Sequence, residues 1–317
     1  GNFPVSFGAL QFNSIDAQTG GSVPTSGQIK FSDFYGTRLQ QVVNFYGSGK
    51  GGSRLVAKDR YNANSSGDVN VIGNYRTRPN NSSGTKVHIH VNQQIGSEKT
   101  RVEHCALRTG SWDSSTTLQV DVGGSGRIGG AGGDGGRGSD SSNGNSTSGR
   151  GGDGTSGLGV QYNPTTVNVA SGGVITAGFG GGGGGGGAYD TDKEGARTAS
   201  GGGGGGGAGI PAGAGGAAGF NAGVNGQPGN AGSISEGGTG GEGGNNDGEA
   251  VAGDGGTGGE ASDSADSGVT GQGGEGSTYS PGPAGSPGAA IRRNTGFTVN
   301  VTNNGSVNGS TNATTVL

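Results

Sequence analysis

Glycine accounts for 83 of the 317 residues and proline for nine, a share of about 29% against roughly 12% in ordinary proteins. This composition excludes one large hydrophobic core and disfavours helices, because glycine is a poor helix former. The single cysteine, Cys105, excludes an intrachain disulfide. No apolar stretch approaches the roughly 18 residues of a transmembrane helix, and the first ten residues lack the pattern of a signal peptide. An ordinary α/β enzyme is therefore not expected.

The charge of the chain is unevenly distributed. The formal net charge is −4, but residues 188 to 276 hold 12 acidic residues against two basic ones, a balance of −10. A nucleic-acid-binding protein needs a basic stripe, which this sequence lacks. Acidic exposed segments favour solubility and suit polar or cationic surfaces. We therefore expect no nucleic-acid partner.

Shifts in composition divide the chain into five parts. The predicted order is a compact N-terminal segment at 1–36, a β-sandwich at 37–122, a β collar with the first glycine-rich strands at 123–177, a polyglycine II body at 178–290 and a closing β segment at 291–317. The predicted fold class is all-β with irregular parts: a small antiparallel β-sandwich followed by a sandwich of polyglycine II helices, with short β collar elements.

The sandwich prediction rests on runs that alternate apolar and polar residues and are bounded by Gly, Asn, Ser or Pro clusters, as strands are. These predicted strands are 42–46, 54–61, 69–75, 87–91, 102–107 and 118–122.

Three later segments share one pattern, a short strand, a glycine-containing turn, an apolar residue and a glycine. They are 118–129, 167–178 and 299–309. We interpret them as related β elements that form a collar where the glycine-rich part begins.

Glycine in the body recurs every three residues. Gly213, Gly216 and Gly219 keep this period, and several later runs do the same, while 180–187 and 201–207 are pure glycine. Three residues per turn is the repeat of the polyproline II helix, which makes no internal hydrogen bonds. Its amides and carbonyls must therefore find partners in neighbouring strands.

An all-glycine strand can be approached closely on every face, whereas a Gly-Gly-X strand must leave X outward. We therefore predict that the two pure runs form an inner layer and that polar X residues such as Asp134, Glu242 and Asp254 face solvent. A disordered Gly/Ser linker is the alternative. The phase of the period within each run argues against it.

Signals of catalysis and metal binding are weak. Gly-x-Gly-x-x-Gly patterns are expected by chance at this glycine content, and the paired carboxylates have no apolar pocket that would shift a pKa. We predict no enzyme activity and no cofactor. His88 and His90 share one face of a predicted strand, and a homotrimer would bring six imidazoles to one axis. We favour two ordinary strand histidines, and we expect Cys105 to be buried.

The triplet glycine runs, their variable connectors and the ending from Ala290 to Gly305 resemble the glycine-rich receptor-binding adhesins of tailed bacteriophages, best known from the long tail fibres of T-even-type phages. The stretch from Ser26 to Gly36 is similar to one that recurs near the N-termini of phage tail and fibre proteins. The resemblance implies a virion protein, assembled in the host cytoplasm, whose distal loops bind a bacterial surface polysaccharide or outer-membrane protein. It also implies that residues 1–36 are a virion-docking segment, through which the protein attaches to other tail or virion proteins.

Recognition is expected in the connectors, because loops on a rigid scaffold commonly carry function. The aromatic and acidic candidates for receptor binding are Tyr189, Asp190, Asp192, Phe220, Asp247, Glu249, Asp263, Asp266 and Tyr279. The candidates for virion docking are the apolar residues Ile29, Phe31, Phe34 and Tyr35. The alternative function is a structural virion component, such as a fibre, collar or capsid decoration, that does not contact the receptor.

Overall fold

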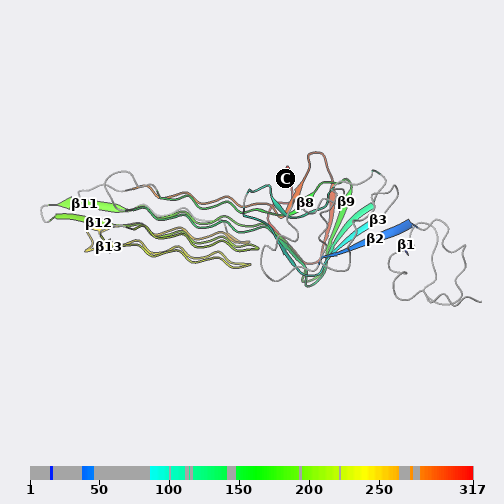
Figure 1. Cartoon of the computed structure of the whole chain (residues 1–317), viewed down its shortest axis with the longest axis horizontal. Coiled ribbons are helices and arrows are strands. Elements are labelled where there is room, and N and C mark those ends of the chain that lie inside the picture. The colour runs from blue at the N-terminus through cyan, green and yellow to red at the C-terminus, as the bar shows by residue number, and fades with distance from the viewer. Residues whose placement is uncertain are drawn as a thin grey trace, which may run out of the picture.

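The computed structural model of this chain is elongated, with β-sheets at one end and long, wavy strands that extend to the other (Figure 1). The structure describes residues 15–16, 38–45, 86–99, 101–110, 114, 117–140, 148–192, 195–220, 223–263, 272–273 and 279–316. Strands, turns and extended segments make up these ranges, which contain no helix and hence no helix able to cross a membrane. The prediction of an all-β protein is confirmed.

Three sheets at one end of the molecule form a unit that we call the β coil. The first sheet has the order β1 (Ile15–Asp16), β2 (Arg38–Phe45), β3 (Lys86–Val91), β6 (Thr117–Val122), β9 (Thr165–Val169) and β17 (Val299–Asn303). The second has the order β18 (Ser306–Asn308), β10 (Val174–Thr176), β7 (Arg127–Gly129) and β4 (Gln94–Gly96). The third has the order β19 (Ala313–Thr314), β16 (Ile291–Arg293), β8 (Ser156–Val160) and β5 (Cys105–Arg108).

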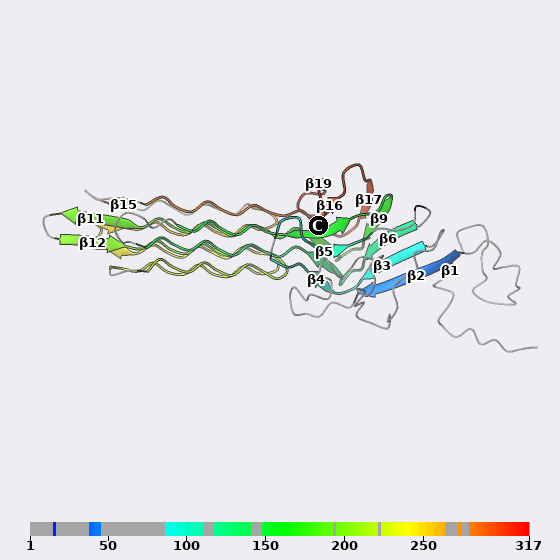
Figure 2. The same ribbon diagram turned by 45° about the horizontal axis from the view of Figure 1, so that its top comes forward.

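The chain winds through these sheets in turn. From β3 onward, each passage adds one strand to the first sheet, one to the second and one to the third, and each new strand pairs in parallel with the strand from the previous passage. Parallel pairing follows from this winding, because the chain always returns to a sheet from the same side. Figure 2 shows the strands of the coil side by side.

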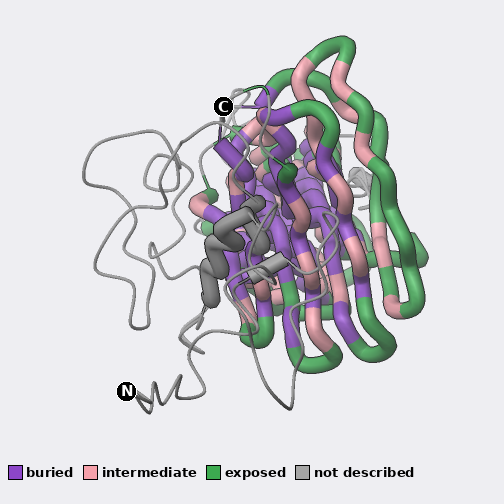
Figure 3. Tube along the Cα trace, turned by 90° about the vertical axis from the view of Figure 1, so that its right-hand side faces the viewer, coloured by how far each residue is buried: buried purple, intermediate pink, exposed green. Residues whose placement is uncertain are grey.

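Apolar side chains from all three sheets form the core of the coil. Ile95, Ile128 and Ile175 occupy matching positions on β4, β7 and β10 and are at most 1% exposed. A second column consists of Leu107, Leu158 and Ile291. Stacking like side chains in register buries apolar surface without cavities, which stabilises the coil. The buried strands run through the middle of the end-on view in Figure 3, with exposed residues at the turns.

The predicted antiparallel sandwich of residues 37–122 requires a correction. The predicted strands at 42–46, 87–91, 102–107 and 118–122 overlap β2, β3, β5 and β6, but β2, β3 and β6 pair in parallel. The one antiparallel partner of a described strand in this part is β1, which pairs with β2 and lies before residue 37. The alternation of apolar residues has the same period in both kinds of pairing, so it could not reveal the direction. The predicted strands at 54–61 and 69–75 lie outside the described residues.

The strand register confirms the prediction that three segments are related β elements, namely 118–129, 167–178 and 299–309. Val122 pairs with Val169, and Val167 with Val301, so β6, β9 and β17 are neighbours in the first sheet. In the second sheet, Ile175 lies between Ile128 and Val307. These segments are successive turns of one coil, which explains why their sequences repeat.

The glycine-rich runs form a second unit, which we call the glycine body. It is inserted between the second and third sheets, once between β7 and β8 and once between β10 and β16. Its runs are 130–139, 148–155, 178–187, 200–210, 212–220, 223–233, 237–244, 252–260 and 280–289. They lie side by side as long, wavy ribbons in Figures 1 and 2.

Backbone hydrogen bonds join each run to several neighbours at once. The amides of Gly202, Gly203 and Gly204 in an inner run donate to three different runs. Their acceptors are the carbonyls of Gly253, Gln227 and Gly136, at 3.1, 2.9 and 2.8 Å. The pattern repeats after three residues, because the next three amides donate to the same three runs at Gly256, Asn230 and Gly133. Three residues per turn is the repeat expected of a polyglycine II helix.

The inner position of the two pure glycine runs is confirmed. All residues of 180–187 and 201–207 are buried, whereas the X residues Asp134, Glu242 and Asp254 are exposed. A Cβ atom on nearly any inner glycine would overlap a carbonyl oxygen of a neighbouring run. Because that carbonyl is fixed in the hydrogen-bond ladder, only glycine permits this packing.

Outward-facing amides of the outer runs have no neighbouring run to bond to, and aspartate side chains at X positions accept several of them. Asp134 accepts from the amide of Ala214 at 2.7 Å, and Asp254 accepts from Gly243 at 2.8 Å. A bond to a carboxylate is stronger than one between neutral groups. These two acidic X residues therefore satisfy amides on the body's surface that no neighbouring run reaches.

We expect Gly204→Ala to destabilise the protein by about 3 kcal/mol, because the added methyl group would overlap the carbonyl of Gly182. Thermal unfolding of the purified protein measures this effect. Glu242→Ala is the control, since Glu242 is an exposed X residue of the same body and should change stability by less than about 0.5 kcal/mol. Equal destabilisation by both substitutions would contradict the packing argument.

We also expect the glycine body to become less stable in acid, because the carboxylate of Asp153 becomes protonated. The hydrogen bond from Arg150 lowers the pKa of Asp153 below its ordinary value of 3.8, and the amide of Ser286 adds to the effect. A folded-state pKa below the unfolded one gives stability that is complete above pH 3.8 and is lost as the pH falls through the lower, folded-state pKa.

We therefore expect Asp153→Asn to unfold at a lower temperature than wild type at pH 7, and the difference to shrink at pH 3. Thermal unfolding of both proteins at the two pH values tests this. A difference that stays constant between pH 7 and pH 3 would show that the carboxylate of Asp153 does not act through its charge.

Candidate functional site

The end of the glycine body farthest from the β coil carries the connection between runs 178–187 and 200–210 and the one between runs 237–244 and 252–260. We call this end the distal tip: strands β11 to β15 together with Asp140, Phe220 and Tyr279, which lie at the ends of neighbouring runs. Strands β11 and β13 lie at the far end of the long axis in Figure 1, and β15 lies there in Figure 2. The β coil lies at the opposite end.

Two small sheets form the framework of the tip. β11 (Ala188–Asp192) and β12 (Gly195–Ala199) pair as an antiparallel hairpin that continues the inner runs 178–187 and 200–210. β13 (Asn245–Asn246), β14 (Ala250–Val251) and β15 (Gln272–Gly273) form the second sheet.

The turn from β13 to β14 has a defined conformation. Asp247 and Gly248 both have positive φ angles, of 53° and 80°, which Asp and Gly tolerate better than most residues. The side chain of Asn245 accepts a hydrogen bond from the Gly248 amide at 2.9 Å, as in turns where Asn stabilises the local backbone. This turn therefore presents the exposed Asp247 and Glu249 in one fixed loop.

Small side chains and polar contacts join the two sheets. Four buried alanines pack together between them: Ala188, Ala199, Ala250 and Ala252. Arg197 on β12 pairs with the carboxylate of Glu249, and Asn246 donates to the carbonyl of Thr198 at 3.3 Å. The tip is thus one connected structure and not a set of independent loops.

The structure brings most of the predicted receptor-binding residues together at this tip. Asp247 and Glu249 are exposed, Tyr189 and Tyr279 are half-buried, and Asp190 is 4% exposed. Phe220 is 72% exposed, the largest value among the described large apolar side chains. The burial of Asp190 makes it a structural residue of the hairpin, whereas Phe220 faces solvent.

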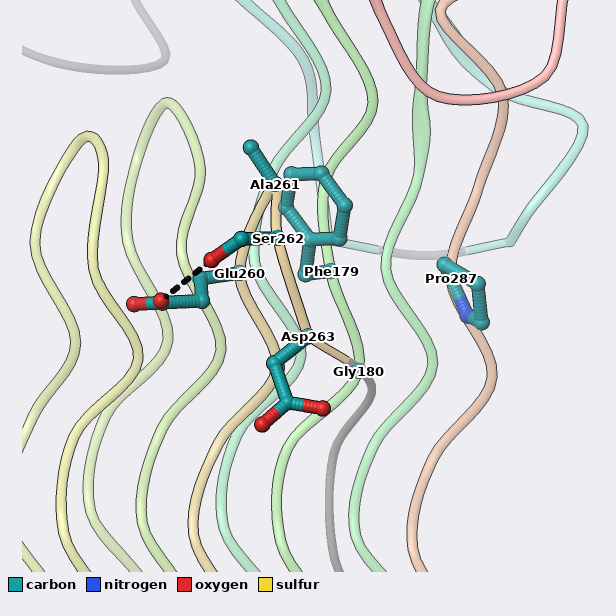
Figure 4. A pocket seen from close by; sticks show the side chains of 8 residues that line it. Phe179, Gly180, Glu260, Ala261, Ser262, Asp263 and Pro287 are labelled. Atoms are coloured by element: carbon teal, nitrogen blue, oxygen red, sulfur yellow. Dashed lines mark hydrogen bonds between the residues drawn. The ribbon is translucent and has the colours of Figure 1, made fainter.

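Asp263 lies at the other end of the body. It lines a hollow of about 260 Å³ with Phe179, Glu260 and Pro287, and Phe179 follows β10 of the coil by three residues. Figure 4 shows the carboxylate of Asp263 below Glu260, whose Oε1 accepts a hydrogen bond from Ser262 at 2.8 Å. Asp263 is therefore separated from the distal tip by the length of the body.

Other predicted site residues fall outside the described part of the chain. Neither the side chain of Asp192 nor any part of Asp266 is described, and the same holds for the docking candidates Ile29, Phe31, Phe34 and Tyr35.

The histidine pair shows no metal site in the part that is described. His90 is half-buried with its Nδ1 3.9 Å from Oδ2 of Asp121, and the side chain of His88 is not described. No group of three or more His, Cys, Asp or Glu side chains suited to a metal occurs among the described residues. Cys105 is 1% exposed, as expected.

Sequence reasoning missed two charged residues of the tip. Asp140 accepts a hydrogen bond from the amide of Phe220 at 2.7 Å and pairs with Arg137 at 2.6 Å, and Arg197 links the two small sheets. A signal for Asp140 was present in the sequence, because Arg137 and Asp140 repeat the spacing of Arg150 and Asp153.

The model of the family described as phage tail fibre adhesin Gp38 matches residues 56–312. No curated protein matches. Among solved structures, the chain is similar to the crystal structure of the gp37–gp38 adhesin tip complex of the bacteriophage S16 long tail fibre, with 18% identity and a TM-score of 0.32 over 90% of this chain and 88% of that one. Because the family match spans most of the sequence, this chain belongs to the phage tail fibre adhesin Gp38 family, whose members bind receptors on the bacterial host.

Proposed function

We propose that the distal tip is the receptor-binding surface of this adhesin. The observation that carries the proposal is the convergence of separate chain segments at one end of a body whose remaining backbone is tied into hydrogen-bond ladders. Loops held on a rigid scaffold lose little conformational freedom when they bind, which favours affinity.

The side chains of the tip support this assignment. Phe220 and Val224 are 72% and 40% exposed, and Val224 lies beside β12, because it forms a β-bridge with Ala199. Exposed aromatic residues are enriched among the residues that dominate binding energy. Along the flanks of the body, by contrast, the X residues are polar and several of them accept hydrogen bonds from the body itself.

The opposite end of the molecule is the proposed attachment end. The N-terminal strands β1 and β2 lie at the edge of the first sheet of the β coil, away from the tip. We propose that residues 1–36, with Ile29, Phe31, Phe34 and Tyr35, dock onto another tail protein, and that assembly takes place in the host cytoplasm. This polarity would place the coil toward the virion and the tip toward the cell.

The test is adsorption of purified full-length protein to the phage's propagating host. Thr191 and Ala196 are exposed partners across the β11–β12 hairpin, so Thr191→Lys with Ala196→Lys would cover the tip with bulk and positive charge. We expect this pair to weaken binding at least tenfold. The matched control is Thr239→Lys with Ala231→Lys, the same residue types at exposed positions of the body's flank.

The control pair should bind within twofold of wild type. Equal loss in both pairs, or no loss in the tip pair, would contradict the proposal and favour a structural role in the virion. Protease treatment of the cells in one arm, and periodate oxidation of their surface sugars in another, would show whether the receptor is an outer-membrane protein or a polysaccharide.

A further inference from the structure

Phe220 differs from the other described aromatic residues of the glycine body in its exposure. Phe179 is 8% exposed, and Tyr189 and Tyr279 are half-buried, whereas Phe220 is 72% exposed. A ring left this open to water gains nothing for folding from burial. It stands at the end of run 212–220, and the preceding Gly219 lies against Ser139 and Ser200, which places Phe220 on the distal tip.

Two hydrogen bonds hold the backbone that leads into Phe220. The preceding Gly219 donates its amide to the carbonyl of Gly201 in the inner run at 2.9 Å, and a Cβ at Gly219 would overlap the carbonyl of Ser139. The amide of Phe220 itself donates to Oδ1 of Asp140 at 2.7 Å. The backbone that carries the exposed ring is therefore fixed by hydrogen bonds.

Asp140 is held in turn by Arg137, whose Nη2 lies 2.6 Å from the same carboxylate oxygen. Arg137 belongs to run 130–139, which is bonded directly to run 212–220 through Gly138 and Ala217 at 2.9 Å. The carboxylate thus accepts one bond from its own run and one from the neighbouring run. A charge-assisted bond of this kind is about twice as strong as a neutral one.

The same arrangement occurs a second time in the body, without an aromatic residue. Arg150 pairs with Asp153 at 2.6 Å, again three residues apart, and Asp153 Oδ1 accepts from the amide of Ser286 at 2.7 Å. Ser286 lies on run 280–289, toward the β coil. The body therefore uses an Arg-x-x-Asp pair to hold an outward amide of a neighbouring run, and at the tip the amide held is that of Phe220.

We infer that Phe220 is the aromatic anchor of receptor binding and that Arg137 and Asp140 are its positioning residues. This inference rests on the proposed function of the tip. A pre-positioned aromatic side chain binds well because it loses little conformational entropy on contact, and such residues dominate binding when they become fully desolvated. Replacing Asp140 by Ala removes the hydrogen bond to the Phe220 amide without altering the ring.

The experiment is a double-substitution cycle measured as the dissociation constant of labelled full-length protein on host cells. We expect Phe220→Ala to weaken binding about 30-fold and Phe220→Tyr, which keeps the ring, to weaken it less than threefold. Asp140→Ala should weaken binding about fivefold. In the Phe220→Ala background, Asp140→Ala should have no further effect, because there is no ring left to position.

Asp153→Ala is the matched control, because it removes the same type of clamp away from the tip. It should leave the dissociation constant within twofold of wild type in both backgrounds. If Asp153→Ala weakens binding as much as Asp140→Ala, or if the effects of Asp140→Ala and Phe220→Ala multiply, the positioning role is wrong. Phe220→Ala removes an exposed side chain and is expected to fold, so the cycle stays informative even if Asp140→Ala unfolds.

Failure of this inference can be distinguished from failure of the proposed function. If Phe220→Ala binds like wild type while the lysine pair Thr191→Lys and Ala196→Lys abolishes binding, the tip is the binding surface but Phe220 is not its anchor. If neither variant affects binding, both the inference and the proposed function are wrong.

Discussion

The structure depends on a hydrogen bond between extended glycine strands that repeats at every third residue. The inner run 201–207 donates to three runs and accepts from three others, and the inner run 180–187 donates to two runs and accepts from three. This requires neighbouring backbones to approach to a distance that any Cβ would prevent. Hydrogen bonds between backbone groups therefore hold the body together, whereas packed apolar side chains do so in ordinary cores. The same requirement accounts for the carboxylates on the outside, since an amide on the surface of the body has no neighbouring strand and bonds instead to residues such as Asp134 and Asp254.

The β coil has the hydrophobic core that the glycine body lacks. Its columns of isoleucine and leucine bury apolar surface, and the body emerges directly from its strands without a linker. Contacts cross the junction: the amide of Ser97 donates to the carbonyl of Ile210 at 3.0 Å, and Lys99 pairs with Asp134 at 2.6 Å. A load applied to the tip is therefore transmitted through continuous ladders to a hydrophobic core.

The sequence allowed the layering of the body to be predicted, because the absence of side chains at every third residue has a direct steric consequence. It also revealed the three related turns of the coil. It could not reveal that the coil strands are parallel, because alternation in stretches such as 118–122 is the same for either direction. Nor did residue type distinguish Asp263 from Asp247, both of which follow a Gly-Gly-X run. They lie at opposite ends of the body because each run reverses the direction of the chain, and run 252–260 leads back toward the coil.

The hydrogen-bond ladders also separate two groups of residues. Residues within the ladders determine folding, whereas exposed residues beyond the ladders are available for recognition. Close to the tip, backbone bonds join Gly244 to Ser200 at 2.9 Å and Ala252 to Gly244 at 2.8 Å. Beyond them, the hairpin and the β13–β14 turn rest on four alanines and a few polar contacts, so exposed residues there can change without disturbing any inner glycine. A surface built in this way can be altered residue by residue while its support stays constant. That division of labour is what an adhesin requires if its receptor varies and its attachment to the virion does not.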